Sequence, residues 1–407
     1  MLDAVRLGRA TTRAALIQAT GLGRSVVEAR LSDLLGRGLL IERSAEPSTV
    51  GRPPRRVAFR GDAGRLLVAD LGATSIDVAD VDLAGRILAR HAEPADIASG
   101  PEAILGRVEV LWDRYREAVE DAGRRIWGIG IAVPGPVEFR TGRPVSRPIM
   151  PGWEEYPLRE RLAQRFGAPV WVDNDVNVMA LGEWRAGAAR GYQDVVFVKL
   201  GTGIGAGVIA DGTLHRGAQG TAGEVGHLQV TDDPSATCRC GNVGCLEALA
   251  GGGAIARGAE LAARNGQSPL LAELLRQHGR LTPRDVARAA GRGDQTSIEL
   301  IQRTGRLVGV MLATVVDFFN PSLIVIGGGV ARAGDALLAT IRETVYRRSL
   351  PVATRDLVVT TSTLGDRAGV TGIATMVLDG IFARDSLARW LDAGEPFAPP
   401  EVAWQSP

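Results

Sequence analysis

The first sixty residues carry a helical pattern of hydrophobic positions and then an extended one. The stretch "TRAALIQATGLGRSVVEARLSDLLGRGLL" predicts a short helix that ends at Gly21 and a second helix over about residues 24–35. Val27, Leu31 and Leu34 recur at i, i+4 and i+7, so they form the buried face of the second helix. Two helices joined by a short glycine-containing turn predict a helix-turn-helix.

Two short strands follow the second helix and enclose a basic loop. "GLLIERSAEPSTVGRPPRRVAFR" predicts strands at 39–43 and 56–60, which would form a wing, and the stiff, basic "GRPPRR" suits a minor groove. The second helix of such a motif enters the major groove with its N-terminal residues leading. Glu28, an acidic residue on this helix, could accept a hydrogen bond from a cytosine amino group. The candidates for contact with DNA are Arg24, Ser25, Val26, Arg30, Arg52 and Arg55.

Charge is distributed unevenly between this head and the rest of the chain. Residues 1–65 contain twelve Arg and six Asp or Glu, a formal charge of +6, whereas the whole chain carries only +1. The remaining residues therefore carry −5. A basic head on a mildly acidic body, together with the turn spacing and the basic wing, favours DNA as the partner over the alternative of a small helical docking domain.

From Gly64 onward, buried strands end in glycine-rich turns. "RLLVADLGATSIDVADVDL" and "DVVFVKLGTGIGAGVIADGTL" both predict strand, turn and strand, whereas "LIVIGGGVA" predicts a strand that opens a helix. A strand after the second turn argues against a dinucleotide-binding Rossmann site. The repeat predicts a duplicated α/β domain with a cleft between two lobes, where backbone N–H groups can approach a phosphate. One such cluster could reflect tight packing alone, but three at strand ends favour nucleotide binding. The candidate nucleotide-binding residues are Asp70, Gly72, Thr74, Gly201, Thr202, Gly203, Gly327 and Gly328.

A carboxylate stands where a strand runs into a helix, in "VWVDNDVNVMALGEW". Asn174 and Asp175 fall at the carboxyl end of the strand, where ligands meet open α/β sheets. Asp175 could take the proton of a sugar hydroxyl group and so activate it for attack on a γ-phosphate, while Asp70 could hold a hydrated magnesium ion. The alternative is that Asp175 or Asp173 simply caps the helix that follows.

All three cysteines of the chain lie together in "CRCGNVGCLE". Three cysteines cannot pair off, and cytoplasmic thiols stay reduced, so a metal is favoured over disulfides. A structural zinc ion takes four ligands, and His227, eleven residues upstream of Cys238, is the best-placed fourth. We therefore expect a structural zinc site, with three ordinary buried cysteines as the alternative. Its ligands would be His227, Cys238, Cys240 and Cys245.

Length and composition suit a globular protein without a membrane segment. The chain has 407 residues, of which 45% are hydrophobic and 23% charged, enough for two or three domains. No apolar run approaches the ~20 residues that a membrane span needs. "MLDAVRLGRATTR" lacks the apolar block of a signal peptide, so we expect a cytoplasmic location and no membrane partner.

The chain closely resembles the ROK family, which comprises repressors, uncharacterised reading frames and sugar kinases, and the resemblance covers essentially all of the chain. "DLGATS" resembles the family's first phosphate motif, and "GIGIAVPGPV" and "MPGW" resemble its inter-strand and sugar-loop signatures. "DNDVNVMALGE" resembles the segment that holds the catalytic aspartate. "GEVGH" followed by "CRCGNVGCLE" resembles the family's zinc signature, which is the most specific of these motifs.

The resemblance implies an actin-like sugar kinase fold, a ribonuclease H-like unit duplicated into two lobes with a hinge. It places the catalytic role on Asp175 and gives His227 a second role on the sugar beside its role on zinc. Ala73 and Ser75 depart from the family pattern, which has Gly and Lys at these positions, whereas Asp70 and Thr74 are kept. The sugar-binding residues that the resemblance implies are Asn174, Asp175, Glu224, His227 and Glu247.

These inferences divide the chain into a winged helix-turn-helix over 1–62, a ROK body over 63–387 with the zinc motif at 227–245, and a loose tail over 388–407. Family members with an N-terminal winged helix are typically sugar-responsive regulators, so the resemblance implies a repressor with operator DNA and a sugar effector as partners. A homodimer, or a dimer of dimers, would place heads on a palindromic operator.

Two alternatives remain open for the body. One is an ATP-dependent hexose kinase that uses Asp175 as general base, with ATP and Mg²⁺ in addition to the structural zinc. The other is a sugar sensor that has kept the kinase cleft and lost ATP binding.

Overall fold

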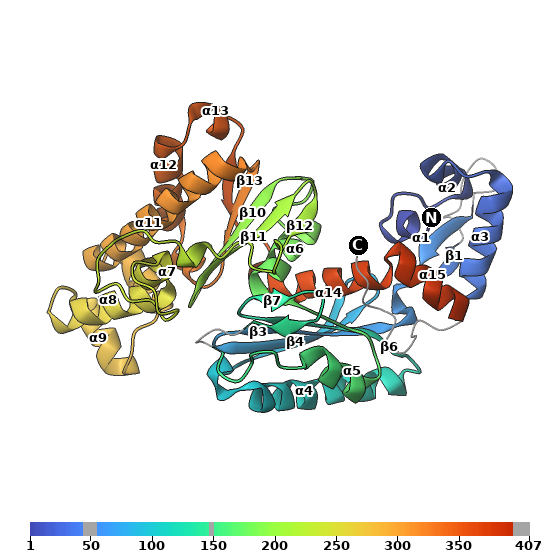
Figure 1. The fold of residues 1–407 in the computed structure, drawn as a ribbon, viewed down its shortest axis with the longest axis horizontal. Coiled ribbons are helices and arrows are strands. Elements are labelled where there is room, and N and C mark those ends of the chain that lie inside the picture. Colours follow the sequence, from blue (N-terminus) through green and yellow to red (C-terminus); the bar gives the residue numbers. More distant parts are fainter. Residues whose placement is uncertain (44–54, 146–149, 394–407) are drawn as a thin grey trace.

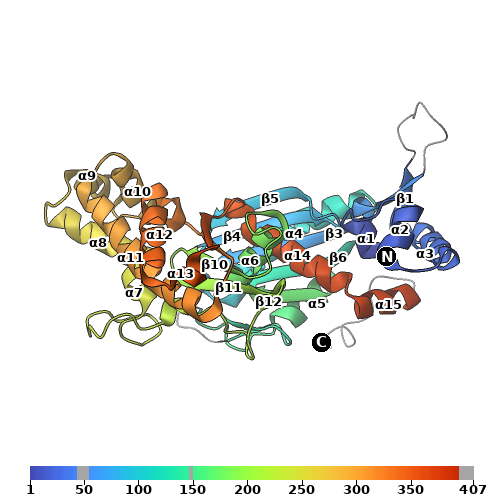
Figure 2. The same ribbon diagram turned by 90° about the horizontal axis from the view of Figure 1, so that it is seen from above.

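The computed structural model describes residues 1–43, 55–145 and 150–393, which form a head and two lobes placed one after another along the long axis (Figures 1 and 2). Arg52, one of the residues expected to contact DNA, lies outside these described residues. Among the described helices, none combines the length and the apolar composition that a membrane crossing needs.

The head has the helices and the two-stranded sheet that the hydrophobic pattern predicts. The side chain of Thr12 caps the second helix by accepting from Ala15 N, and Gly21 ends that helix in the left-handed region at φ 67°. Val27, Leu31 and Leu34 are buried, as predicted for the face of the third helix. The elements are α1 (Leu2–Arg6), α2 (Arg13–Thr20), α3 (Arg24–Gly36), β1 (Leu40–Arg43) and β2 (Arg56–Phe59), with β1 and β2 antiparallel.

The two lobes are built on one plan, which confirms the predicted duplication. Each sheet has five strands, ordered β5-β4-β3-β6-β9 and β12-β11-β10-β13-β14, so the first, second and third strands of each half form an antiparallel meander and the fourth and fifth join in parallel. Parallel neighbours need crossover connections, and helices supply them in both lobes.

The first sheet is covered by α4 (Pro101–Asp121) and α5 (Leu158–Phe166) on its outer face (Figure 1). Its strands are β3 (Arg65–Gly72), β4 (Ser75–Asp82), β5 (Ile87–Pro94), β6 (Ile126–Val133) and β9 (Val170–Asn174), with a small hairpin of β7 (Val137–Glu138) and β8 (Arg143–Pro144). The second sheet contains β10 (Val195–Leu200), β11 (Ile204–Ala210), β12 (Thr213–His215), β13 (Leu323–Gly327) and β14 (Val358–Thr361). Its outer helices are α7 (Leu246–Ala250), α8 (Gly252–Arg264), α9 (Pro269–His278), α10 (Pro283–Gly291), α11 (Gln295–Phe319), α12 (Asp335–Arg348) and α13 (Pro351–Thr354).

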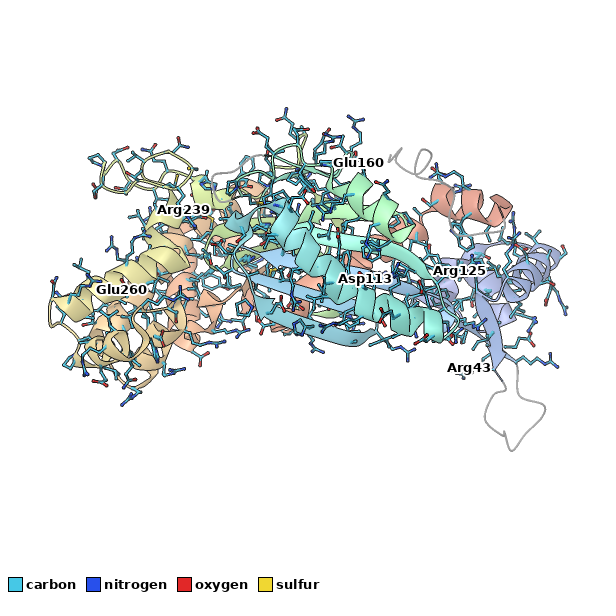
Figure 3. The ribbon with its side chains drawn as sticks, turned by 90° about the horizontal axis from the view of Figure 1, so that it is seen from below. Arg43, Asp113, Arg125, Glu160, Arg239 and Glu260 are labelled. Atoms are coloured by element: carbon cyan, nitrogen blue, oxygen red, sulfur yellow. The ribbon has the colours of Figure 1, made fainter. Side chains whose placement is uncertain are left out.

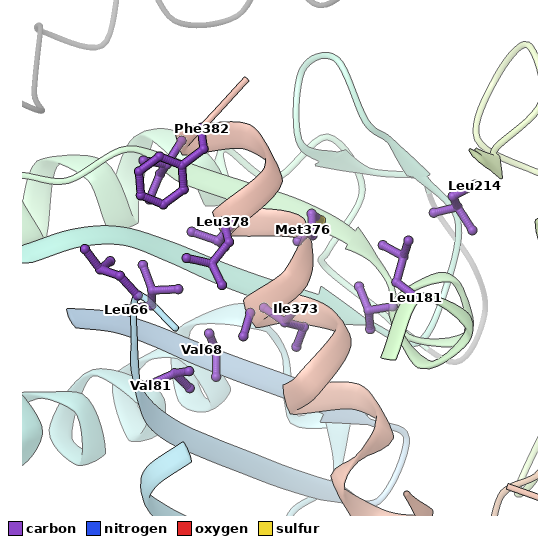
Figure 4. Packing of buried hydrophobic residues seen from close by; sticks show 14 of the residues in the cluster. Leu66, Val68, Val81, Leu181, Leu214, Ile373, Met376, Leu378 and Phe382 are labelled. Atoms are coloured by element: carbon purple, nitrogen blue, oxygen red, sulfur yellow. The ribbon is translucent and has the colours of Figure 1, made fainter. Parts of the chain in front are cut away.

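Two helices pack on each other between the sheets: α6 (Asp175–Ala186) and α14 (Ala368–Ile381). Their backbones approach closely, because a Cβ atom at Gly182 would strike Ala368 O and one at Gly372 would strike Val178 O. Apolar side chains of α14 fill the space above the first sheet (Figure 4). The core around these helices includes side chains from both sheets, so the lobes meet through α6 and α14.

The head is joined to the body by a continuous hydrophobic core rather than by a free linker. Phe59 of the head packs edge-on against Phe382, with ring centroids 5.6 Å apart, and Arg6 lies over the same ring. Helix α15 (Arg384–Ala393) lies beside the head, and its Leu391 carbonyl oxygen accepts a hydrogen bond from Arg37 at 2.6 Å (Figures 1 and 2).

The expectation of a loose tail from residue 388 is wrong for residues 388–393, which belong to α15. The physical reason is Trp390, whose side chain is buried against Trp127 with ring centroids 5.7 Å apart. Burial of such an aromatic pair stabilises a helix that is too short to be stable alone.

Candidate functional site

A cleft of about 960 Å³ lies between the two lobes at the ends of their strands. It brings together residues from both halves of the chain that are far apart in sequence. All of the residues expected to bind nucleotide, sugar or a reacting hydroxyl group line it: Asp70, Gly72, Thr74, Asn174, Asp175, Gly201, Thr202, Gly203, Glu224, His227, Glu247, Gly327 and Gly328.

Asn174 caps helix α6, so the proposal that Asp175 or Asp173 is the N-cap is wrong. Its Oδ1 accepts from Val176 N at 2.8 Å and Asn177 N at 3.2 Å, and its Nδ2 donates to the Gly135 carbonyl oxygen at 3.0 Å. Asn174 accepts from the backbone N–H groups of the first turn that have no partner within the helix. The carboxylate of Asp175 is therefore not used as a cap and faces the cleft.

Asp173 has a separate structural role one residue earlier. It is buried, and it accepts from Asn177 Nδ2 at 2.9 Å and from Arg216 Nε at 2.8 Å. Arg216 follows β12 of the second lobe, so this buried pair ties the loop after β12 to the end of β9.

Lys199 also lines the cleft, although the sequence patterns did not single it out. It projects from β10 and forms an ion pair with Asp175 Oδ2. Burial alone would lower the pKa of Lys199, but attraction by Asp175 and Asp70 outweighs burial and leaves the pKa above its ordinary value. One signal could have found it: of the 47 basic residues in the chain, Lys199 alone is a lysine.

Asp70 lies at the end of β3 next to the start of α14. A Cβ atom at Gly369 would strike its carboxylate, so a glycine is needed there. Burial raises the pKa of Asp70 to about 7, against the opposing attraction of Lys199 and with a further contribution from Asp175. This carboxyl group therefore keeps its proton to a higher pH than an ordinary aspartate.

The glycine turn after β13 differs from the prediction that it opens an α-helix directly. β13 ends at Gly327, a 3-10 turn follows over Val330–Ala333, and α12 begins only at Asp335. Gly328 adopts φ 89° because its backbone turns back against Leu200 O, where a Cβ atom would clash. The glycines line the cleft, but without an α-helix N-terminus behind them.

Acidic side chains and a histidine gather at the other end of the cleft. His227 Nε2 lies 3.8 Å from Glu224 Oε2. Glu247 accepts a hydrogen bond from Ile204 N at 3.1 Å through Oε2, and its Oε1 lies 3.7 Å from Arg239 Nη2. Arg239 projects from the cysteine loop (Figure 3). Carboxylates and an imidazole in this arrangement suit a ligand with several hydroxyl groups.

The three cysteines and His227 form a compact donor cluster, as the spacing predicts. Their ligand atoms all lie within 4.8 Å of one another. Cys238 Sγ is 3.8 Å from His227 Nδ1, and Cys240 Sγ is 3.7 Å from Cys245 Sγ. Around tetrahedral zinc with Zn–S bonds of about 2.3 Å, neighbouring sulfur ligands stand about 3.8 Å apart.

The chemistry of the cluster fits a closed structural zinc site. Burial, together with the neighbouring thiols, raises the pKa of Cys245 to about 12, so its thiolate needs a cation beside it at neutral pH. His227 turns Nδ1 to the sulfurs and Nε2 to Glu224. A metal held by Nδ1 would fix the ring so that Nε2 meets a ligand in the cleft.

In the head, the N-terminal half of α3 is exposed. Arg24, Ser25, Val26 and Arg30 all face solvent, and Val26 is 45% exposed although it is apolar. Arg55 is also exposed and pairs with Glu42 at 2.8 Å. Figure 3 places Arg43 at the end of β1, at the base of the wing.

Glu28 does not stand free to contact a base. Its Oε2 accepts from Arg13 Nε at 3.0 Å, and Arg13 also donates to Glu42 Oε1 at 2.6 Å. Glu28 therefore links α3 to α2 through Arg13, and Glu42 links both helices to the wing.

The chain is similar to known proteins of two kinds: repressors, which match the head and the body, and sugar kinases, which match the body. The model of the ROK family matches residues 67–380. A xylose repressor from Caldicellulosiruptor bescii is 30% identical over 377 residues, which cover 91% of this chain and 92% of that protein. A glucokinase from Halalkalibacterium halodurans is 35% identical over 303 residues, which cover 74% of this chain and 92% of the kinase.

Among solved structures, the chain is likewise similar to a regulator and to a kinase. The crystal structure of a ROK family transcriptional regulator, a homologue of the E. coli MLC protein, is similar with a TM-score of 0.79 and 26% identity, over 94% of both chains. A ROK family glucokinase from Streptomyces griseus, solved with glucose and AMPPNP, is similar with a TM-score of 0.67 and 32% identity, over 77% of this chain and 99% of the kinase.

Proposed function

This chain belongs to the ROK family, and from that premise we propose that it is a sugar-responsive DNA-binding transcriptional regulator acting as a repressor. The observation that carries the proposal is the extent of similarity. The xylose repressor and the solved regulator match more than nine-tenths of the chain, and the glucokinases match about three quarters. A match over 91% is more than residues 63–407 alone supply, so it extends into the head.

The geometry of the head supports a role in DNA binding. Helix α3 presents an exposed N-terminal half whose side chains include Arg24 and Arg30. An exposed apolar side chain such as Val26 suits contact with a thymine methyl group, and arginine suits guanine or phosphate. The opposite face of α3 is buried in the head, which fixes the orientation of the exposed face. Two heads in a homodimer, or four in a dimer of dimers, would read the half-sites of an operator.

The sugar effector would bind in the cleft. Glu224, His227 and Glu247 stand at one end, and Asn174 and Asp175 stand at the carboxyl end of β9. These groups accept and donate hydrogen bonds at several points, which suits a polyhydroxylated ligand. Zinc, when bound, supplies a rigid frame that holds His227 toward the ligand, and it takes no part in any reaction.

Helices α6 and α14 would connect sugar binding to DNA binding. α6 starts at Asp175 in the cleft, and α14 runs from Asp70 to the head (Figure 1). For the sugar to act as an effector, it must bind two arrangements of the lobes with different affinity.

An ATP-dependent hexose kinase is the second candidate, and a specific observation favours it. The glucokinase from Halalkalibacterium halodurans is 35% identical over its 303 matched residues, against 30% over 377 residues for the xylose repressor. Asp175 also stands in the cleft, where a general base would be needed. ADP release that depends on one sugar, without specific DNA binding, would establish this reading in place of the first.

The test is a titration of the purified full-length protein into labelled DNA from upstream of its own gene and of neighbouring sugar genes. Anisotropy is measured with and without each member of a sugar panel, and ADP is assayed in parallel with ATP and Mg²⁺. We expect one DNA fragment to bind specifically, with an affinity that falls steeply with salt and changes with one sugar. Absence of any specific fragment would refute the regulator.

Arg24→Ala tests the placement of the recognition helix. We expect it to weaken operator binding by about 1 kcal/mol or more. Arg303→Ala is the matched control, because Arg303 is equally exposed but lies on α11 in the second lobe. Equal operator affinity for the two variants would contradict the assignment of α3.

A further inference from the structure

The single lysine of the chain lines the cleft. Lys199 stands on β10 between Gly205 of β11 and Gly327 of β13. Its stem runs along the glycine turn, since a Cβ atom at Gly201 would stand 3.5 Å from Lys199 Cε. Its ammonium group ends against Asp175 Oδ2, where the side chain of Asp175 is only 5% exposed.

Two carboxyl groups share this one ammonium group. Asp175 pairs with it directly, and Asp70, at the end of β3, is close enough for each of the two groups to alter the titration of the other. The Lys199 charge is thus matched by the charge of Asp175, and burial holds the proton on Asp70 to a higher pH than on an ordinary aspartate. The cluster therefore has little surplus negative charge with which to attract a divalent cation.

We propose that Lys199 is the resident cation of this cleft, that it takes the place a magnesium ion would need beside Asp70 and Asp175, and that the cleft therefore binds a sugar without phosphorylating it. The inference rests on the proposed function, because it takes the cleft to be a sugar site. It goes further by naming the residue that separates sensing from phosphoryl transfer.

The residues present do not fit a magnesium nucleotide. Magnesium requires a near-octahedral shell of oxygen ligands at about 2.1 Å, and it must reach the phosphate oxygens at the same time. An ammonium group has no lone pair to offer and repels the ion. The side chain of Lys199 lies along the Gly201 turn and ends at Asp175, so its charge stands beside both the turn and the carboxylate that a magnesium nucleotide would have to reach.

Lys199 changes the role of Asp175 from base to ligand. A general base must accept the sugar hydroxyl proton, and a lone pair of Oδ2 already accepts from the Lys199 ammonium group. The other oxygen can still accept a hydrogen bond from a hydroxyl group, because that interaction needs no proton transfer. Asp175 therefore keeps its use for recognition and loses much of its use for catalysis.

The unique lysine allows a direct test on the wild-type protein. Full-length, zinc-loaded protein labelled with ¹³Cε-lysine gives one lysine resonance, which reports on Lys199 alone. Mn²⁺ replaces Mg²⁺ at oxygen sites and broadens resonances of nearby nuclei. We expect Mn²⁺ with AMPPNP to leave the resonance sharp, and a bound sugar to shift it. Loss of the resonance at stoichiometric Mn²⁺ would overturn the proposal, as would sugar-dependent ADP release by the wild type.

Lys199→Met supplies the complementary test, because methionine keeps an unbranched stem beside Gly201 and removes the charge. A fixed charge ~5 Å from a divalent ion weakens its binding at least about tenfold even at the dielectric constant of water. We expect Lys199→Met to bind Mn²⁺ at least about tenfold more tightly than wild type, and the further change Asp70→Asn to remove the gain. Equal Mn²⁺ affinity of wild type and Lys199→Met overturns the proposal.

Two readouts keep the outcomes separate. If Lys199→Met does not fold, because two carboxyl groups then face each other unpaired, the resonance of the wild type decides. Sugar binding is measured by calorimetry on the same wild-type samples. A wild type that binds no sugar refutes the proposed function, whereas the Mn²⁺ experiments still decide whether Lys199 excludes the metal.

Discussion

Glu183 on α6 is a buried carboxylate that should be hard to replace. Its side chain is fully buried, and the described contacts include no cation. Its Oε1 accepts from Ser362 Oγ at 2.5 Å and from Leu364 N at 2.9 Å, and its Oε2 accepts from Ala188 N at 2.7 Å. Residues 362–364 connect β14 to α14, so this one side chain holds the segment through which the second lobe returns to the first.

The size of the effect follows from these contacts. Glu183→Ala leaves three backbone N–H groups, of Ala188, Thr363 and Leu364, and the hydroxyl groups of Ser362 and Thr363 without this acceptor. Each buried unsatisfied group costs about 1–3 kcal/mol. Relaxation and entry of water recover part of this sum. We therefore expect a loss of about 3–5 kcal/mol in the free energy of unfolding, similar to breaking a buried charged interaction. Glu183→Gln keeps the shape and one acceptor oxygen, and should lose about 1–2 kcal/mol.

Urea denaturation followed by circular dichroism and by tryptophan fluorescence measures the loss, and Trp184 lies next to the substituted residue. Glu117→Ala is the control, because Glu117 is exposed on α4 and should change stability by less than about 0.5 kcal/mol. A loss below about 1 kcal/mol for Glu183→Ala would refute the reasoning, since it would mean that the donors of the 362–364 segment find other acceptors.

Three further predictions follow from the zinc cluster, the head contact and a buried carboxyl group. Cys240→Ser, or removal of zinc by a chelator, should abolish zinc content and weaken sugar binding at least about tenfold; retained zinc by mass spectrometry would contradict the ligand set. Asp379 Oδ1 forms ion pairs with Arg6 of the head at 3.3 Å and with Arg185 of α6 at 3.2 Å. Asp379→Asn should therefore lower the free energy of unfolding by about 1 kcal/mol and reduce the effect of sugar on DNA affinity. A sugar effect as large as in wild type would show that this carboxylate does not couple the two sites. Burial raises the pKa of Asp80 from 3.8 to about 6 in the folded protein. The folded state therefore binds this proton more tightly than the unfolded state does. The resulting stabilisation is complete below pH 3.8 and is lost as the pH rises through about 6. Asp80→Asn should therefore raise the free energy of unfolding at pH 7 by about 1–2 kcal/mol and flatten its pH dependence, and an unchanged profile would count against the shift.

Structural features that depend on residues close together in the chain could be predicted from the sequence. The burial of Val27, Leu31 and Leu34 follows from helical spacing, and the meeting of Cys238 with His227 follows from a short loop between ligands. The duplicated sheets follow from two similar strand and turn patterns. In each of these cases the residues that interact lie close together in the chain, or repeat a pattern that does.

Features that depend on the packing of distant segments could not be predicted. The sequence "DND" offers three good capping residues in a row, and only the point at which β9 ends makes Asn174 the cap. Lys199 and Asp175 lie on neighbouring elements that meet only in the folded lobe. The burial of Trp390 depends on Trp127, which lies more than two hundred residues earlier. The single lysine was visible in the sequence, but its partner was not.

Helices α6 and α14 cross closely at Gly182 and Gly372, so a small tilt of α14 at this crossing displaces its far end. From Gly372 at the crossing to Ile381 at its far end, α14 extends by about 14 Å, at about 1.5 Å per residue. A tilt of about 10° at the crossing would therefore swing that end by ~2 Å. Hydrogen bonds to base edges tolerate only a few tenths of an ångström. Phe382 and α15 contact the head directly. A small rotation of α14 at the cleft would therefore displace the head far enough to break the fit between its surface and DNA.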